Sequence, residues 1–453
     1  MNLLASPLTT DLYQLTMLNA YYAHGMGETA VFELFVRKLP ASRNFMMAAG
    51  LEQAMAFLEH LRFAPEELEW IEASGKFSRG FAVHLERLRF TGDVHAAPEG
   101  TIFFPDEPVL RVTAPLPEAQ LVETRLINLV HFETLVATKA ARSVLAAPGK
   151  LLVDFGLRRA HGAEAGLLAA RASYIAGYTG TATVAAGQRM GIPVFGTMAH
   201  SFVEAHDDET AAFQRFAEAC PQNVVLLIDT YDTEAGARKV VELAPRLAQR
   251  GIRVKGVRLD SGDLAALARS VRRILDEGGL SEATLFASGN IDEDRIRDLL
   301  AGGAPIDGFG VGTSLVTSSD APYLDAVYKL QEYAGKARRK RSTGKATWPG
   351  RKQVYRHTDR AGRFEYDVIT VEGEERQGEQ LLVHVMRNGK RLDAPESLAA
   401  IRERAAAQLA KLPARLRALE PAASPYRVEI APALRKLADQ VDRAASEVPA
   451  LCR

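Results

Sequence analysis

The segment GTMAHSF, residues 196–202, carries the side chains best suited to chemistry in this sequence. The apolar run at residues 192–195 precedes it and is expected to form a short buried strand, and a helix is expected to follow. Thr197, His200 and Ser201 would therefore lie where a strand ends and a helix begins, which is the edge that binds ligands in parallel α/β folds. A histidine there could act as a nucleophile or proton carrier near neutral pH. A lone histidine after a turn is more often a capping or surface residue, so the neighbouring segments decide its interpretation.

Apolar runs alternate with helical patterns from about residue 150 onward. Most successive runs lie about 30 residues apart, which is the length of a βα unit. This rhythm predicts a parallel sheet with crossover helices, and it leaves open whether the sheet closes into a barrel. The expected strands are residues 151–155, 192–195, 224–228, 254–259, 284–287 and 307–311.

Polar residues and glycines follow each expected strand. Any one such segment has an ordinary explanation, because Asp and Ser cap helices and Gly punctuates turns. Six consecutive strand ends rich in Arg, Asp, His, Ser and Gly are harder to explain in that way, and in a (β/α) barrel this face binds the substrate. The other five segments are DFGLRR (154–159), DTYD (229–232), RLDSGD (258–263), SGN (288–290) and GFGVGTS (308–314).

Together these strand ends could bind a phosphorylated sugar. Backbone N–H groups at Gly312 and Thr313 can approach a phosphate. Arginines can clamp phosphate or carboxylate oxygens, and aspartates can bind ribose hydroxyls or magnesium. The side chains in question are Arg158, Arg159, Arg258, Asp229 and Asp260.

Several function classes fit the sequence poorly. The first expected strand is not followed by GxGxxG, which weakens a dinucleotide-binding interpretation, and GxSxG is absent, which argues against a serine hydrolase. Lys+Arg and Asp+Glu number 56 each, so broad electrostatic binding of nucleic acid is not expected. Cys220 and Cys452 form no CxxC pair, so neither a disulfide framework nor a zinc site is predicted. Without an apparent signal peptide or membrane-spanning run, a cytoplasmic location is expected.

The segments before and after the alternating apolar runs and helices contain both helical and strand patterns. We expect three parts: an α+β N-terminal domain over residues 1–145, the α/β catalytic domain over 146–330, and a C-terminal extension over 331–453. Expected helices cover 6–25, 118–143, 397–417 and 432–446, and expected strands include 29–37, 81–90 and 109–114. Tyr13 lies in the first helix and, without further context, is interpreted as a core aromatic.

Seven motifs, in this order, resemble those of nicotinate phosphoribosyltransferase. They are TDLYQLTM, DFGLRRAHG, GTMAHSF, LLIDTYDT, GVRLDSGDL, ASGNIDE and DGFGVGTSL. The later KRSTGKATWPGRKQVYR also looks like that family's loop containing lysine and proline. The resemblance extends from about residue 9 to about residue 356. Seven ordered motifs are far more specific than any single one.

The resemblance implies an activity, a fold and an assembly. The family makes nicotinate mononucleotide and diphosphate from nicotinate and 5-phosphoribosyl 1-diphosphate in NAD salvage. It is an ATP-dependent ligase that works through a phosphohistidine and needs Mg²⁺. Its fold is the irregular (β/α) barrel of type II phosphoribosyltransferases with an α+β N-terminal domain and a C-terminal extension. It is usually a head-to-tail homodimer with shared active sites.

The resemblance also assigns roles to residues. His200 matches the phosphorylated histidine. The nicotinate contacts fall on Tyr13, Thr197 and Arg258, with Phe155 as one face of an aromatic sandwich and Tyr13 reaching in from the partner subunit. Asp260 is expected on the ribose hydroxyls and Arg158 near the phosphates. The remaining expected substrate-binding residues are Ser201, Asp229, Gly289, Gly312 and Thr313.

The sequence also allows other substrates and functions to be weighed. Nicotinamide is disfavoured because Met198 stands where nicotinamide-specific relatives carry Asp, and because Arg258 would gain more from a carboxylate than from an amide. Quinolinate enzymes are shorter and catalyse a decarboxylation. A non-catalytic scaffold of the same fold would not need Tyr13, His200, Arg258 and Asp260 together. A barrel aldolase would need a Schiff-base lysine near a strand end, and Lys255 comes too early in its strand.

Overall fold

The computed structural model describes residues 6–446, so Cys452 and the first residues of the chain lie outside the description. The described chain forms two compact units. The first unit joins the residues up to Leu135 with those from Tyr323 onward, and the second runs from Val136 to Pro322. The predicted three-part division with boundaries at 145 and 330 stays a prediction. Among the described residues, none of the helices is both long enough and apolar enough to span a membrane.

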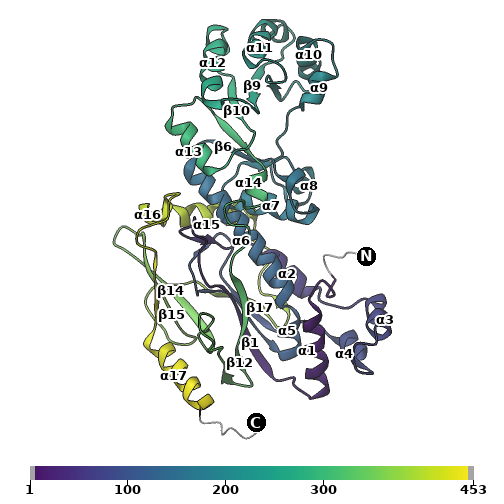
Figure 1. Ribbon diagram of the computed structural model, residues 1–453, viewed down its shortest axis with the longest axis vertical. Coiled ribbons are helices and arrows are strands. Elements are labelled where there is room, and N and C mark those ends of the chain that lie inside the picture. The colour runs from purple at the N-terminus through teal and green to yellow at the C-terminus, as the bar shows by residue number, and fades with distance from the viewer. Residues whose placement is uncertain (1–5, 447–453) are drawn as a thin grey trace. The chain divides into compact units, whose positions relative to one another are not determined.

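The second unit is built on a parallel six-stranded sheet with the order β7-β6-β11-β10-β9-β8. Figure 1 labels β6, β9 and β10 of this sheet among the helices of the unit. Its strands are β6 (Leu151–Asp154), β7 (Gly180–Thr181), β8 (Val224–Leu227), β9 (Val254–Leu259), β10 (Thr284–Ala287) and β11 (Gly308–Val311). All five pairings within it are parallel. Five of these strands are the ones that the βα spacing predicts, whereas β7 was not expected, and the parallel order brings the carboxyl ends of the strands to one edge.

Aspartate caps begin several of the helices that connect these strands. Asp232, Asp263 and Asp292 each accept a backbone N–H bond from the first turn of the following helix, which satisfies a donor that a helix start otherwise leaves unpaired. The predicted cap at Asp263 is confirmed. The connecting helices are α7 (Ala163–Ala176), α8 (Val184–Met190), α10 (Glu209–Ala219), α11 (Thr233–Ala248), α12 (Leu264–Glu277) and α13 (Glu293–Ala301).

The strand expected at residues 192–195 is reduced to a single bridge between Val194 and Thr181. Pro193 has no N–H to donate to a ladder, and Val194 is 49% exposed rather than buried. The predicted buried strand is therefore wrong. Beyond the bridge, the side chain of Asn223 donates to the carbonyl of Gly196 at 3.1 Å, so a side-chain bond links this segment to the residue that precedes β8.

The first unit is organised around an antiparallel seven-stranded sheet with the order β13-β12-β1-β5-β3-β17-β18. Its central strand β1 (Thr29–Val36) pairs with β5 (Pro108–Pro115) on one side and with β12 (Ala326–Tyr333) on the other. β3 (Asp93–Ala96) pairs with β17 (Val383–Arg387). Segments from before and after the second unit therefore share one sheet. The short edge strands are β13 (Lys336–Ala337) and β18 (Lys390–Arg391).

Helices and two smaller sheets, β16-β14-β15-β19 and β2-β4, complete the first unit. The main core contains Leu15 and Leu18 of α1 (Leu12–Ala23), Phe32 of β1, and Leu126 of α6 (Glu123–Ala146). A separate small core lies around Val354. The remaining elements are β2 (Met46–Met47), α2 (Leu51–Glu59), α3 (Pro65–Ala73), α4 (Phe81–Arg87), β4 (Ile102–Phe103), α5 (Leu116–Leu121), β14 (Lys352–Thr358), β15 (Phe364–Val371), β16 (Glu379–Gln380), α15 (Leu398–Lys411), α16 (Ala414–Arg417), β19 (Arg427–Ile430) and α17 (Pro432–Ser446).

Four expectations for the first unit need correction. Residues 81–90 were expected as a strand, but α4 buries Phe81, Ala82 and Leu85 on one face of a helix. The helix expected over 118–143 is two helices, α5 and α6, and the helix expected over 397–417 is also two, α15 and α16. The first helix begins at Leu12 after the N-cap Asp11 rather than near residue 6. In each case short apolar runs fit more than one period or boundary.

Candidate active site

A cavity of about 520 Å³ opens at the carboxyl ends of β6, β9, β10 and β11 in the second unit. Most of the residues that line it come from the segments that directly follow those strands. They are Phe155, Arg158, Arg159, Arg258, Asp260, Ser288, Gly289, Asn290, Ile291, Asp292, Gly310, Gly312, Thr313, Ser314 and Ser319. The cavity therefore brings together most of the residues that the sequence singles out.

Arg258 is the most constrained side chain in the cavity. Its Nε–H donates to Ser288 Oγ at 2.8 Å, and its Nη2 donates to Asp260 Oδ1 at 3.0 Å. Its Nη1 donates to Thr197 Oγ1 at 3.2 Å. The guanidinium carbon lies 5.4 Å from the centroid of the Phe155 ring, within the range of a cation–π contact. A fixed cation beside an aromatic ring can orient a flat anionic ligand.

Asp260 is held as a carboxylate. Burial alone would raise its pKa, but the hydrogen bond from Ser288 and the positive charge of Arg258 outweigh burial and leave the pKa below its usual value. The backbone N–H of Asp260 donates to Asp229 Oδ2 at 2.8 Å, and Ser261 Oγ donates to the same oxygen at 2.6 Å. The other oxygen of Asp229 is buried and lacks a hydrogen-bond partner within residues 6–446.

His200 is the first residue of the short helix α9 (His200–Glu204). Its Nδ1 lies 3.1 Å from Thr230 Oγ1, and its Nε2 lies 3.8 Å from Asp260 Oδ2. The side chain is 38% exposed, so one edge of the ring is open to a reactant. Ser201 follows on the same helix, and neither His200 nor Ser201 is among the residues that line the cavity. The predicted site residues Thr197 and Asp229 also lie outside that lining.

Two glycines allow the backbone to pass close to these side chains. Gly289 has φ +89°, and a Cβ there would lie 1.8 Å from the carbonyl oxygen of Asp260. A Cβ at Gly310 would lie 2.6 Å from the Phe155 ring. Side chains larger than hydrogen would displace Asp260 or Phe155, so the positions of both depend on glycine.

The cavity has a surplus of positive charge. Arg158 and Arg159 belong to the 3₁₀ turn η1 (Leu157–Arg159) and are exposed. Within the described part of the chain, neither side chain makes a hydrogen bond or ion pair, whereas Asp292 is occupied as the cap of α13. The cavity is thus suited to a ligand that carries several negative charges.

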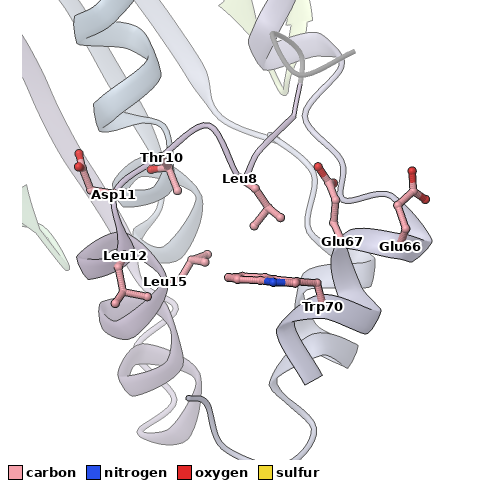
Figure 2. Close-up of a pocket in the computed structure, with 8 residues that line it drawn as sticks. All are labelled: Leu8, Thr10, Asp11, Leu12, Leu15, Glu66, Glu67 and Trp70. Atoms are coloured by element: carbon pink, nitrogen blue, oxygen red, sulfur yellow. The ribbon is translucent and has the colours of Figure 1, made fainter. Parts of the chain in front are cut away.

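A second hollow of about 520 Å³ lies in the first unit and differs in chemistry. Figure 2 shows Trp70 and Leu15 beside each other beneath Leu8, with the carboxylates of Glu66 and Glu67 nearby. The charged residues that line this hollow, Asp11 included, are all acidic. An anionic ligand therefore fits the cavity of the second unit.

Three family models match successive parts of the chain. The nicotinate phosphoribosyltransferase N-terminal domain matches residues 8–131, the nicotinate phosphoribosyltransferase family matches residues 151–346, and the corresponding C-terminal domain matches residues 374–438. The chain belongs to the nicotinate phosphoribosyltransferase family. The family resemblance expected from the seven motifs is confirmed.

Individual members of the nicotinate phosphoribosyltransferase family match over most of their length. The Mycobacterium tuberculosis nicotinate phosphoribosyltransferase pncB2 is 50% identical over 425 residues, which cover 93% of this chain and 91% of that protein. The Bacillus subtilis nicotinate phosphoribosyltransferase is 42% identical over 357 residues, or 77% and 72% of the two chains. The crystal structure of human nicotinic acid phosphoribosyltransferase superposes with a TM-score of 0.86 at 30% identity and covers 95% of this chain and 99% of that one. The predicted fold class, an irregular (β/α) barrel with flanking N- and C-terminal parts, is confirmed.

Sequence reasoning gave no role to two residues that the site uses. Ser288 contacts both Arg258 and Asp260, and Thr230 contacts the ring of His200. Both belong to segments that were recognised as polar strand ends. Their partners come from other strands, so the pattern of a single segment carries no signal for these contacts.

Tyr13 lies in the first unit, on α1, and is 47% exposed. The interpretation of Tyr13 as a core aromatic is therefore wrong. Burial raises its pKa, with a further contribution from the charge of Glu123. The reach of Tyr13 into a partner's site, as the nicotinate phosphoribosyltransferase resemblance implies, stays a prediction.

Proposed function

We propose that this protein forms nicotinate mononucleotide and diphosphate from nicotinate and 5-phosphoribosyl 1-diphosphate, as a step of NAD salvage. The observation that carries the proposal is the fixed guanidinium of Arg258 beside the Phe155 ring, in a cavity with two further arginines whose side chains have no partner within residues 6–446. Membership of the family supports the same activity. The bond between the anomeric carbon and the diphosphate oxygen breaks, and the pyridine nitrogen forms the new bond to that carbon.

Arg258, Thr197 and Phe155 form the part of the site that binds nicotinate. Arg258 pairs with the nicotinate carboxylate through a charge-assisted bond, and the Thr197 hydroxyl, already 3.2 Å from Arg258, lies next to that pair. The Phe155 ring stacks on the pyridine, a contact that contributes about 0.5–1.5 kcal/mol beyond area burial. The pyridine nitrogen is itself the nucleophile, so these residues orient it rather than activate it.

The sugar side needs charge stabilisation. Displacement at the anomeric carbon passes through an oxocarbenium-like state, which a nearby carboxylate favours. Asp260 is ionised at neutral pH because its pKa is lowered, and it accepts bonds from the ribose hydroxyls. Arg158 and the backbone at Gly289, Gly312 and Thr313 receive the phosphates.

Two carboxylates fit a magnesium ion in this site. Mg²⁺ is usually held by one or two carboxylates together with substrate phosphates and water. Asp229 Oδ1 is a buried acceptor without a partner among the described residues, and Asp229 and Asp260 are joined by a backbone hydrogen bond. The described residues contain no cluster of three or more His, Cys, Asp or Glu that could hold a metal, so phosphate oxygens would complete the shell. When bound, the ion neutralises charge on the leaving diphosphate.

His200 is proposed as the site of ATP coupling. The phosphorus–oxygen bond to ADP breaks, a phosphorus–nitrogen bond forms at the ring, and later hydrolysis releases phosphate. The support is the 38% exposed ring, held by Thr230 at Nδ1 and adjacent to Asp260. The ring lies close enough to the sugar-binding carboxylate for its phosphorylation to alter binding there.

We also propose a homodimer with shared sites. The first unit exposes Leu12, Tyr13 and Trp70 by 51%, 47% and 53%, respectively. Large apolar side chains gathered on α1 and α3 are typical of an interface between subunits. In the dimer, Tyr13 of the partner subunit covers the second face of the pyridine ring.

The deciding experiment is product formation from 5-phosphoribosyl 1-diphosphate and Mg²⁺ with nicotinate or nicotinamide, each with and without ATP. Nicotinate mononucleotide, formed in preference and faster or further with ATP, is the expected result. Preference for nicotinamide would overturn the role given to Arg258. Absence of product with both substrates would point to a ligand-binding scaffold.

A further inference from the structure

A buried cluster of four charged side chains lies next to segments that line the cavity of the second unit. Lys139 Nζ lies 2.7 Å from Glu293 Oε2 and 3.0 Å from Asp320 Oδ1, and Arg142 Nε donates to Glu293 Oε1 at 2.9 Å. The side chains of Lys139, Arg142, Glu293 and Asp320 are 3%, 5%, 1% and 17% exposed. The two cations and two carboxylates balance.

Each carboxylate follows directly on a segment that lines the cavity. Glu293 is the first residue of α13 and comes after the lining segment 288–292, which leaves β10. Asp320 comes after Ser319, in the segment that follows α14 (Thr313–Val316). Lys139 therefore joins two segments that line the cavity, through the residue that follows each of them. Ser314 Oγ adds a second tie by donating to the carbonyl of Ile291 at 2.6 Å.

Backbone conformation suggests that both loops need this support. Asn290 in the first loop has φ +52°, and Ser318 in the second has φ +45°. Residues other than glycine hold such angles only when their surroundings impose them. Gly289, next to Asn290, already packs against Asp260.

The cluster is a poor device for stability alone. Charges buried in pairs lose solvation that their attraction only partly restores, and apolar replacements of similar volume are often neutral or stabilising. The cluster instead contributes fixed geometry, because charged hydrogen bonds set the separation of the groups that they join. A phosphate cradle depends on such fixed distances.

We propose that Lys139 is a positioning residue for 5-phosphoribosyl 1-diphosphate. It holds the loop after β10 and the segment after α14 at the separation that receives the ribose phosphate. The identity of this ligand rests on the proposed function, whereas the bracing of the two loops does not.

The first test measures the loops themselves by hydrogen exchange in the full-length protein. Lys139→Met removes both ties, and Asp320→Asn weakens one of them with less burial at stake. We expect faster exchange in residues 288–292 and 314–320 in both variants. Lys352→Met is the matched control, because Lys352 pairs with Glu33 in an equally buried contact of the first unit. It should destabilise the protein without changing exchange in the two loops.

The second test measures steady-state constants. In Lys139→Met, and to a smaller extent in Asp320→Asn, the KM for 5-phosphoribosyl 1-diphosphate should rise by about tenfold or more, while the KM for nicotinate changes little. Lys139→Arg keeps a cation between the carboxylates and should restore most of the affinity. Lys352→Met should leave both KM values unchanged.

The outcomes separate the two claims. Unchanged loop exchange in folded Lys139→Met and Asp320→Asn would overturn the bracing, whatever the activity. Altered exchange with an unchanged KM would overturn the positioning role. If Lys139→Met does not fold, Asp320→Asn supplies both readouts. A wild-type protein that neither binds nor consumes 5-phosphoribosyl 1-diphosphate would remove the proposed function but not the bracing.

Discussion

At the scale of single residues, the site works through side chains that hold one another. Ser288 accepts from Arg258 and donates to Asp260, and Arg258 also donates to Asp260. The three residues come from β9, the segment after β9 and the segment after β10. Because the contacts are reciprocal, the loss of one side chain leaves polar partners unsatisfied and costs more than one hydrogen bond.

Arg258→Ala should reduce kcat/KM for nicotinate by at least about 30-fold, which corresponds to about 2 kcal/mol for a hydrogen bond to a charged group. The reason is the loss of the cation that pairs with the substrate carboxylate. Steady-state kinetics with varied nicotinate measures the effect. Arg238→Ala is the control, because the Arg238 side chain is 57% exposed and, among the described residues, pairs only with Glu234 on the same helix. A kcat/KM close to that of the wild type would remove Arg258 from the carboxylate site.

His200→Ala should abolish ATP hydrolysis and the stimulation by ATP while some nucleotide synthesis remains. The ring nitrogen that accepts the phosphoryl group is then absent, but the groups that bind nicotinate and the sugar are intact. Coupled assays of ADP and nicotinate mononucleotide measure the two activities. His206→Ala is the control, because the His206 ring contacts only the nearby Phe202 within the described chain. Full ATP coupling in His200→Ala would exclude His200 as the phosphorylated residue.

Ser288→Ala should move the acid limb of the pH profile of kcat/KM to higher pH. Asp260 acts as a carboxylate, so activity falls as pH drops through its pKa, which the Ser288 bond helps to keep below the usual value. Without that bond the pKa rises and protonation begins at higher pH. The sign for stability is the same, since a lowered folded-state pKa stabilises the fold above the unfolded pKa and that contribution is lost in acid. An acid limb at the wild-type position would contradict this role for Ser288.

At the scale of elements, the carboxyl ends of the parallel strands decide which residues meet. The alternation of apolar runs and helical patterns was enough to predict β6 and β8 to β11, because each of those runs is largely buried and bounded by polar segments, but it did not predict the two-residue strand β7. It misjudged residues 192–195, where Pro193 cannot support a ladder, and residues 81–90, where the apolar spacing also fits a helix. Contacts such as Thr230 with His200 join separate strand ends, so they depend on the register of the sheet and cannot be derived from local pattern.

Gly310→Ala should raise the KM for nicotinate by about tenfold, taking about 1.4 kcal/mol from the usual cost of overpacking. The new methyl group would meet the Phe155 ring at 2.6 Å and push it away from the pyridine position. Nicotinate kinetics and thermal unfolding together separate loss of stacking from loss of stability. Gly27→Ala is the control, because a Cβ there meets no atom within 4 Å. An unchanged KM would show that the position of Phe155 does not limit nicotinate binding.

At the scale of the whole molecule, the proposed homodimer predicts that two variants of low activity complement each other when they are mixed. Tyr13→Ala and Arg258→Ala should each lose most activity, whereas a refolded mixture of the two should regain part of it. In mixed dimers one site receives an intact Tyr13 from one subunit and an intact Arg258 from the other. Activity after mixing, compared with each variant mixed with itself, measures the effect. A mixture no more active than its components would argue against shared sites.

The sheet that joins β1 to both β5 and β12 also bears on how the chain is made. As synthesis proceeds, β1 and β5 leave the ribosome early, but β12 follows only after the whole of the second unit. The second unit is one continuous stretch, so it can fold as soon as it has emerged. Until β12 has been synthesised, one side of β1 has no partner strand in the first unit, and the pairing of segments distant in sequence is slow. The exposed edge of β1 is therefore the place where a nascent chain of this protein most needs protection from aggregation.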